Sequence, residues 1–335
     1  MVKDALSQSK FNEIVDGLLT GYASCQAIAV AVSGGPDSMA LCHLLAQWGN
    51  ARSIDVHALS VDHGLRKESA DEAEQVGVWL SALGVQHQVL RWDTPSEKRV
   101  QEEARKARYA MMARYCAEHD IRALFLGHHM DDQAETVLFR LAKGSGLDGL
   151  VGMRAVQNYD ENLCLMRPLL NATKSDILDF CARSGISFVQ DPSNESDQYS
   201  RVRLRRARSV LEEEGLSAKR LSVTARRLLR ARNALDEIAK KTYEKNAVEI
   251  NSKRVVFDVN ALSTCPEEIV LRVILRGMEM FRHGANYAPR MERVEGLVSN
   301  LLGAMRDAQT FRKRTLGGVV FEYDHKKAHF ILEKE

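Results

Sequence analysis

The chain has 335 residues, a length that suits two domains. Hydrophobic residues make up 45% of the sequence and charged residues 27%, as is typical of a soluble globular protein. No apolar run reaches the roughly 18–20 residues of a membrane helix, and the N-terminus lacks the apolar stretch of a secretory signal. We therefore expect a cytoplasmic protein with no membrane partner.

The cysteines and the basic residues indicate which kinds of site the chain can form. Six cysteines are scattered along the chain without a CxxC pair, which favours buried thiols over a disulfide framework or a zinc site. The net charge is only +2, yet residues 201–232 contain eleven Lys/Arg and three Glu, a local excess of +8. Such a run is typical either of a solvated helix face or of a surface that binds phosphate or nucleic acid.

Strand-like and helix-like segments alternate over the first two hundred residues. Short apolar runs predict strands at 27–32, 54–61, 85–92 and 122–127. Helical patterns follow them, around 41–48 and at 69–84, 99–119 and 131–143. This rhythm predicts an α/β fold with a doubly wound parallel sheet, in which ligands bind beyond the carboxyl ends of the strands.

The pattern changes after about residue 215. A long helix is predicted at 221–245, further helices at 264–281 and 289–305, and a closing hairpin at 317–333. We therefore predict an α/β domain over 1–215 and a second, mainly helical domain over 216–335 that ends in a hairpin.

The first predicted strand ends in a turn that reads SGGPDS, residues 33–38. It has neither the lysine of a Walker A loop nor a GxGxxG pattern. Its glycines let amide groups point outward, and the helix that follows adds a positive N-terminal end, which suits an anion such as pyrophosphate. Because Asp37 would repel phosphate, the turn also implies a bridging Mg²⁺. The alternative is a tight strand–helix turn with Ser and Asp caps.

A second polar group follows the strand predicted at 122–127. Two histidines directly precede three acidic residues in the first turn of a helix. Acidic residues are favoured there by the helix dipole, so a surface helix is the simplest interpretation. Crowded carboxylates and imidazoles also indicate a cation site, although the HExxH pattern of many zinc sites is absent. The residues concerned are His128, His129, Asp131, Asp132 and Glu135.

These motifs resemble those of known families. SGGPDS after an apolar strand resembles the PP-loop of N-type ATP pyrophosphatases, which cleave ATP to AMP and pyrophosphate. The stretch LGHHMDDQAETVLFRLAKGSGLDGLVGM (126–153) is more specific and resembles the tRNA(Ile)-lysidine synthase family. VDHGLR, ARKARY, RPLL, DPSN, PRMERVE and RTLGGVV are also similar, so that the resemblance covers nearly the whole chain.

The resemblance implies a tRNA-modifying ligase that forms a carbon–nitrogen bond. Such an enzyme adenylates the wobble cytidine of tRNA(Ile) with a CAU anticodon, joins L-lysine to C2 of that base to form lysidine, and releases AMP and pyrophosphate. Mg²⁺ would be held by Asp37, and Arg105 and Arg108 would meet phosphate or developing negative charge. Asp131, Asp132 and Glu135 would bind lysine and Mg²⁺ and supply the base, without a division of roles. ATP would contact Ser33, Gly34, Gly35, Pro36, Asp37, Ser38, His63, Gly127 and His128.

The basic run would bind tRNA. Arg201, Arg203 and Arg205 resemble the family's arginine-rich block, although Val202 stands where the family pattern has asparagine. Arg226 and Arg227 on the following helix would add contacts with the tRNA backbone, which are salt-sensitive. The sequence leaves open whether the chain forms a homodimer.

Three other functions remain as alternatives. A cytidine thiolase shares the PP-loop but commonly carries the CxxC pairs that this chain lacks. A carboxylate-activating amidotransferase or synthetase shares SGGxDS but not the HHxDDQAET block. A non-catalytic tRNA-binding protein would need neither Asp37 nor the acidic residues.

Overall fold

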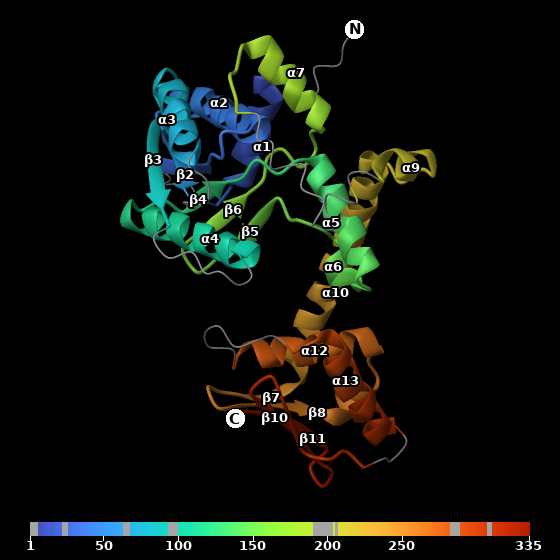
Figure 1. Ribbon diagram of the computed structural model, residues 1–335. Coiled ribbons are helices and arrows are strands. Elements are labelled where there is room, and N and C mark those ends of the chain that lie inside the picture. The colour runs from blue at the N-terminus through green and yellow to red at the C-terminus, as the bar shows by residue number, and fades with distance from the viewer. Residues whose placement is uncertain are drawn as a thin grey trace. The chain divides into compact units, whose positions relative to one another are not determined.

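A computed structural model describes residues 6–21, 26–62, 68–92, 100–189, 204, 207–281, 289–306 and 310–335. Contacts divide the chain into two units, Met1–Leu228 and Leu229–Glu335 (Figure 1). This division falls within helix α10 (Ala218–Asn246). The boundary after residue 215 lies just before that helix and stays a prediction.

The first unit is built on a six-stranded sheet with the order β3-β2-β1-β4-β6-β5. Neighbouring strands are parallel except for β5, which pairs antiparallel with β6. This confirms the doubly wound sheet. The chain passes from β1 to β2 and β3 on one side and then crosses to β4, so the strand order switches between β1 and β4. The strands are β1 (Ala27–Ala31), β2 (Asp55–Asp62), β3 (Gln86–Arg91), β4 (Ala123–Phe125), β5 (Val156–Asn158) and β6 (Cys164–Met166).

Helices cover both faces of this sheet. The side chains of Ile28 and Val30 pack with α1 (Gln8–Leu18), α2 (Pro36–Asn50), α3 (Glu68–Ser81) and α7 (Lys174–Ser184). On the other face, Ala29 packs with α4 (Val100–Glu118). The strand sequence AIAVA is apolar at every position because both of its faces are buried.

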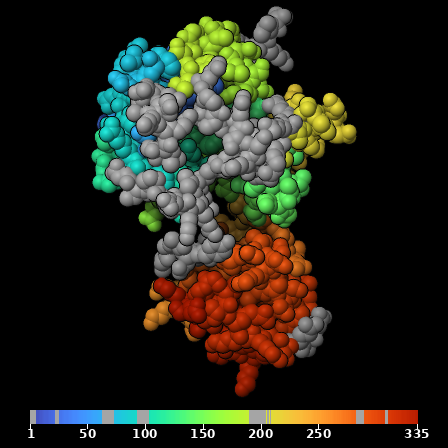
Figure 2. Space-filling view, in the orientation of Figure 1, coloured from blue at the N-terminus to red at the C-terminus, as the bar shows by residue number. Residues whose placement is uncertain are grey.

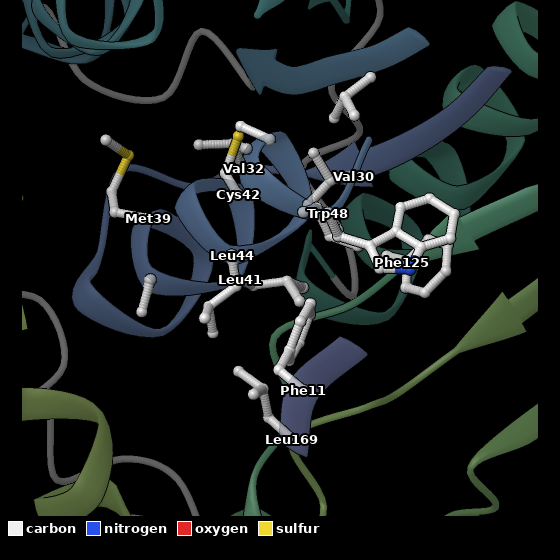
Figure 3. Packing of buried hydrophobic residues seen from close by; sticks show 14 of the residues in the cluster. Phe11, Val30, Val32, Met39, Leu41, Cys42, Leu44, Trp48, Phe125 and Leu169 are labelled. Atoms are coloured by element: carbon white, nitrogen blue, oxygen red, sulfur yellow. The ribbon is translucent and has the colours of Figure 1, made fainter. Parts of the chain in front are cut away.

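The main core lies between α2 and the strands (Figure 3). Phe11, Trp48 and Phe125 are among its largest fully buried side chains. The indole of Trp48 donates a hydrogen bond to Asp16 Oδ1 at 2.8 Å, so the one polar atom of this side chain is satisfied. Replacing Trp48 with Ala would leave a large cavity and cost about 3–5 kcal/mol of unfolding free energy.

Helix α5 (Met130–Ala142) packs on the start of α10. Ala134 and Val137 of α5 lie against Ala218, Leu221 and Ala225 of α10, and these small side chains let the helices approach closely. Two short helices adjoin these in the sequence: α6 (Leu147–Leu150) follows α5, and α9 (Arg208–Glu213) precedes α10. Figure 2 shows α9 in yellow and α7 in yellow-green on the outer surface of this unit.

The second unit combines helices with an antiparallel sheet of order β7-β8-β11-β10-β9. Phe257, Phe321 and Phe330 of this sheet pack against Ile274 and Leu301 of two helices. The predicted closing hairpin is the β10–β11 pair. It forms part of a five-stranded sheet whose other strands the sequence analysis did not predict. The strands are β7 (Ala247–Ile250), β8 (Arg254–Asp258), β9 (Arg314–Leu316), β10 (Val319–Asp324) and β11 (His329–Lys334); the helices are α11 (Val259–Ser263), α12 (Glu267–Glu279) and α13 (Met291–Arg306).

Two composition-based predictions are tested over the described part of the chain. None of the helices found there combines the length and apolar character needed to cross a membrane. Cys42, Cys116, Cys164 and Cys181 are buried free thiols, as predicted, whereas Cys265 is only partly buried.

Candidate active site

The SGGPDS turn joins the carboxyl end of β1 to the start of α2. Gly34 has φ of +83°, a backbone conformation that favours glycine. Gly35 is the N-cap of α2 and Pro36 its first residue, a position where the missing amide hydrogen of proline costs nothing. These local preferences explain why the strand ends and the helix begins here.

The turn is held together by the hydroxyl of Ser38. This buried oxygen accepts a hydrogen bond from the amide of Ser33 at 3.1 Å and donates to the carbonyl of Gly35 at 3.0 Å. Among the described residues, the amides of Gly34, Gly35, Asp37 and Ser38 have no hydrogen-bond acceptor. The turn therefore presents a set of open N–H groups at a helix N-terminus, an arrangement that suits a phosphate group.

Gly127 brings the end of β4 against the same turn. A Cβ atom added at Gly127 would lie 3.1 Å from the carbonyl carbon and oxygen of Asp37 and 3.2 Å from the amide of Ser38. Only a glycine allows this approach without displacing the backbone of the turn. The two segments, each predicted to follow a strand directly, thus meet at one edge of the sheet.

His129 lies between the carboxylates at this edge. It is the N-cap of α5, with Nε2 3.7 Å from Asp37 Oδ1 and 3.4 Å from Asp132 Oδ2. Its Nδ1 accepts a hydrogen bond from the amide of Asp131 at 3.2 Å. Burial acts to lower the pKa of His129, but the interactions with Asp131, Asp132 and Asp37 outweigh it and raise that pKa. The carboxylates therefore favour the protonated form of the imidazole.

The alternative interpretation, a surface helix with an acidic first turn, does not hold for Asp131. Asp131 is buried, with its Oδ2 accepting a hydrogen bond from the backbone of Lys174 at 2.8 Å. Asp132 is the N3 residue of a capping box and accepts from the amide of His129 at 3.0 Å. Both carboxylates thus orient the segments around Asp37, and Asp132 stays partly accessible.

Lys174 is a candidate site residue that the sequence analysis did not identify. It is the first residue of α7, and its ammonium lies 2.6 and 2.7 Å from the two carboxylate oxygens of Asp37. A capping box of Thr173 and Asp176 fixes the start of this helix. The TxxD spacing after RPLL is a signal for that helix start, although nothing local indicates the contact with Asp37.

Arg105 and Arg108 lie together with a third arginine, Arg167, in what we call the arginine cluster. The guanidinium carbons of Arg105 and Arg108 lie 5.2 and 5.7 Å from the ring centre of Tyr109. Arg167 is buried and donates to the carbonyl of Arg154 at 2.9 Å. Burial and the charge of Arg105 lower the pKa of both Arg108 and Arg167. No carboxylate within the described part of the chain forms an ion pair with the cluster.

Burial and the arginine cluster together determine the state of His128. Arg167 Nε donates to His128 Nδ1 at 3.3 Å. Burial, followed by the charges of Arg167, Arg105 and Arg108, lowers the pKa of His128 to about 3. The imidazole is therefore neutral at pH 7, and the cluster keeps its positive charge for an anion. Arg167 directly follows β6, so the rule that ligands bind beyond strand ends is the signal that would have found it.

Glu135 and Asp131 line a small pocket between α5, Leu204, α9 and the start of α10. Its volume is about 30 Å³, and its lining includes a third carboxylate, Glu212. Its remaining lining is apolar: Ala134, Leu138, Leu204, Leu211, Leu216, Ala218 and Leu221. A volume of this size holds only a few water molecules, so the pocket places carboxylates beside an apolar surface without enclosing a ligand.

The predicted tRNA-binding residues are only partly described. Arg226 and Arg227 are exposed on α10, where Arg227 lines a shallow depression with Lys219 and Arg220. This gives α10 a basic surface. His63, Arg201, Arg203 and Arg205 lie outside the described residues.

Asp37 is the carboxylate that belongs to the SGGPDS turn itself, and both of its oxygens contact the ammonium of Lys174. The described part of the chain contains no group of three His, Cys, Asp or Glu side chains arranged around a metal. A single carboxylate such as that of Asp37 fits Mg²⁺, which proteins hold by one or two carboxylates together with substrate phosphates and water. It gives no support to a zinc site, which needs three or four protein ligands.

Comparisons with known proteins identify the family of the chain. Residues 4–213 match the PP-loop domain family. The tRNA(Ile)-lysidine synthase of Methylobacterium nodulans is 38% identical over 321 residues, which cover 94% of this chain and 92% of that protein. The tRNA(Ile)-lysidine synthase of Ruegeria pomeroyi is 36% identical over 307 residues, covering 91% and 71% respectively.

A solved structure supports the fold. The U34-tRNA thiolase NcsA of Methanococcus maripaludis superposes with a TM-score of 0.55 at 18% identity, covering 66% of this chain and 79% of that one. At this identity the likeness concerns the fold alone. The sequence relatives are more specific, and they show that the chain belongs to the tRNA(Ile)-lysidine synthase family of PP-loop proteins.

Proposed function

We propose that the protein uses ATP to ligate L-lysine to C2 of the wobble cytidine of tRNA(Ile) with a CAU anticodon. The observation that carries this proposal is the convergence of three sites at one sheet edge. The open amides of the SGGPDS turn, the arginine cluster and the acidic residues of α5 come from β1, α4, β6 and α5 of the same unit. The printed names of the relatives supply the tRNA and the product.

The first step is adenylation of the base. The C2 oxygen of cytidine attacks the α-phosphorus of ATP, and pyrophosphate leaves. The open amides of the turn bind the phosphates, and the arginine cluster neutralises the charge that builds up on them. Neutral His128 contributes no competing charge, because its low pKa keeps it unprotonated. When bound at Asp37, Mg²⁺ supplies further charge neutralisation.

The second step is attack by lysine. The ε-ammonium must first lose a proton, and a carboxylate of Asp131, Asp132 or Glu135 accepts it. The nitrogen then adds to C2, the C2–O bond breaks, and AMP leaves with the bonding electrons. The surface beside Glu135 supports this assignment, since its apolar side chains suit the four-carbon stem of lysine and its carboxylates suit an ammonium group.

The tRNA would be held by the basic surface. We assign Arg226 and Arg227 on α10, together with Arg201, Arg203 and Arg205, to contacts with phosphates. Because ATP, lysine and tRNA are cytoplasmic substrates, the proposed reaction takes place in the cytoplasm. A homodimer is compatible with this function but is not required by it.

The reaction can be tested with labelled ATP and labelled lysine. We expect AMP release and lysine incorporation with the CAU-bearing isoleucine tRNA, and neither with initiator methionine tRNA, which has the same anticodon. The Asp37→Asn variant should bind tRNA but release little AMP. ATP cleavage without lysine incorporation would refute lysidine synthesis, and tRNA binding without ATP cleavage would favour a non-catalytic binder.

A further inference from the structure

The SGGPDS turn exposes its amides because its carbonyl groups are bonded into the protein. The carbonyl of Gly34 accepts from the amide of Val189 at 2.8 Å, and that of Gly35 accepts from an amide of α2 at 3.0 Å. The carbonyl of Val32, immediately before the turn, accepts from the hydroxyl of Ser60 at 2.8 Å. Of these three bonds, only the last comes from a side chain outside the turn and its helix.

A second side chain supports Ser60. His87 on β3 has its Nε2 2.8 Å from the hydroxyl oxygen of Ser60 on β2. The single hydroxyl proton of Ser60 is directed at Val32, so His87 must be the donor in this pair. The result is a chain of hydrogen bonds that crosses three parallel strands, from His87 through Ser60 to the peptide that opens the turn.

The residues around His87 and Ser60 leave space for this series of hydrogen bonds. Ser60 pairs in register with Val89, two residues from His87, so both polar side chains lie on the face covered by α3. A Cβ atom at Gly77 of α3 would lie 3.1 Å from Nδ1 of His87, so a glycine at that position admits the imidazole. Ser60 is itself buried, which raises the cost of leaving its partner unsatisfied.

We propose that Ser60 and His87 are positioning residues for nucleotide binding, because they fix the orientation of the Val32–Ser33 peptide. The amide of this peptide donates to Ser38, and its carbonyl accepts from Ser60. Without the hydroxyl, the bond from this amide to Ser38 is left alone to oppose a rotation that turns the carbonyl oxygen outward. Ser38 also bonds Gly35, so the whole cradle of amides would be disturbed. A carbonyl oxygen facing phosphate is repulsive, whereas an amide is attractive.

The test measures ATP affinity by titration calorimetry in the absence of tRNA and lysine, so that no chemistry occurs. We expect Ser60→Ala to weaken ATP binding about tenfold, the effect of one buried hydrogen bond. Ser60→Thr, which keeps the hydroxyl, should bind like the wild type. Ser81→Ala is the matched control, since Ser81 also donates to a backbone carbonyl, that of Gly77 at 2.9 Å, but is exposed on α3.

The histidine gives an independent comparison. His87→Gln offers an N–H donor in place of Nε2–H and should retain most of the affinity, whereas His87→Phe fills the space without a donor and should lose about threefold. Hydrogen exchange at the amide of Ser33 should accelerate in Ser60→Ala and His87→Phe. A purely structural role would lower the melting temperature without changing affinity or this exchange.

The inference rests on nucleotide binding at the SGGPDS turn, which the proposed function also needs. If the wild type bound no ATP, both would be overturned. If the wild type bound ATP and Ser60→Ala bound it equally well, the inference alone would fail. Should Ser60→Ala not fold, equal affinities of His87→Gln and His87→Phe would overturn it.

Discussion

Replacing Lys174 with methionine removes the cation that neutralises Asp37 while keeping the length of the side chain. The ammonium lies 2.6 and 2.7 Å from the two oxygens of Asp37, with 35% of the lysine side chain and 29% of the aspartate side chain exposed. The pair is therefore mostly, but not fully, withdrawn from solvent. The variant leaves Asp37 with His129 Nε2 at 3.7 Å and with the N-terminus of α2.

The expected cost can be estimated from these contacts. Hydrogen bonds to charged groups contribute about 1.5–3 kcal/mol, and partial exposure reduces this through solvent screening. The positive helix N-terminus compensates Asp37 further. We therefore expect Lys174→Met to lower the unfolding free energy by about 1–2 kcal/mol, or the melting temperature by roughly 2–8 °C for a unit of this size.

The assay is thermal unfolding followed by circular dichroism, with and without Mg²⁺. If Asp37 is a metal ligand, Mg²⁺ should stabilise Lys174→Met more than the wild type, because the metal no longer competes with the ammonium. Lys313→Met is the control: it breaks a 2.6 Å pair with Glu322 whose side chains are 58% and 45% exposed, and its stability should change little. If Lys174→Met and Lys313→Met lowered the melting temperature equally, the reasoning for Lys174 would be refuted.

Further predictions concern the site and the tRNA surface. Gly127→Ala should weaken ATP binding at least about tenfold in calorimetry, because its Cβ would press on the backbone of Asp37. Folding lowers the pKa of His128 from its ordinary 6.5 to about 3. Each pH unit below 6.5 should therefore lower the free energy of unfolding by about 1.4 kcal/mol, because the unfolded chain binds this proton and the folded protein does not. The raised pKa of His129 means that its protonation stabilises the folded protein below pH 6.5, and that this stabilisation is lost as the pH rises through the folded-state pKa. Urea unfolding of His128→Gln and His129→Gln across this pH range should therefore show opposite trends. Arg227→Gln should reduce the salt slope of tRNA binding by about one, measured by filter binding; an unchanged slope would remove it from the interface.

Much of the first unit follows from local sequence. The run AIAVA predicted a buried strand, the glycines and proline of SGGPDS predicted a turn into a helix, and the segments that became β2, α3, β3 and α4 followed in order. These features depend on side-chain periodicity and backbone preference over a few residues. They also placed the SGGPDS turn and the polar group of α5 directly after predicted strands.

Other elements carried too little signal. Strands β5, β6 and β9 have three residues each, and no periodicity can be recognised over that length. Their partners in the sheet define them, through pairs such as Ala123 with Cys164. The second sheet was therefore anticipated only at its final hairpin, whose strands are longer.

The sequence by itself determined which residues could do the chemistry: the amides of the SGGPDS turn, Asp37, the two arginines of α4 and the acids of α5. Only the tertiary structure decided their electrostatic state. His128 and His129 are adjacent, yet one lies against arginines and the other among carboxylates, so their pKa values shift in opposite directions. Lys174 meets Asp37 across 137 residues of sequence. Local patterns specify turns and helices, but contacts at such separation arise only when packed strands bring their carboxyl ends to one edge.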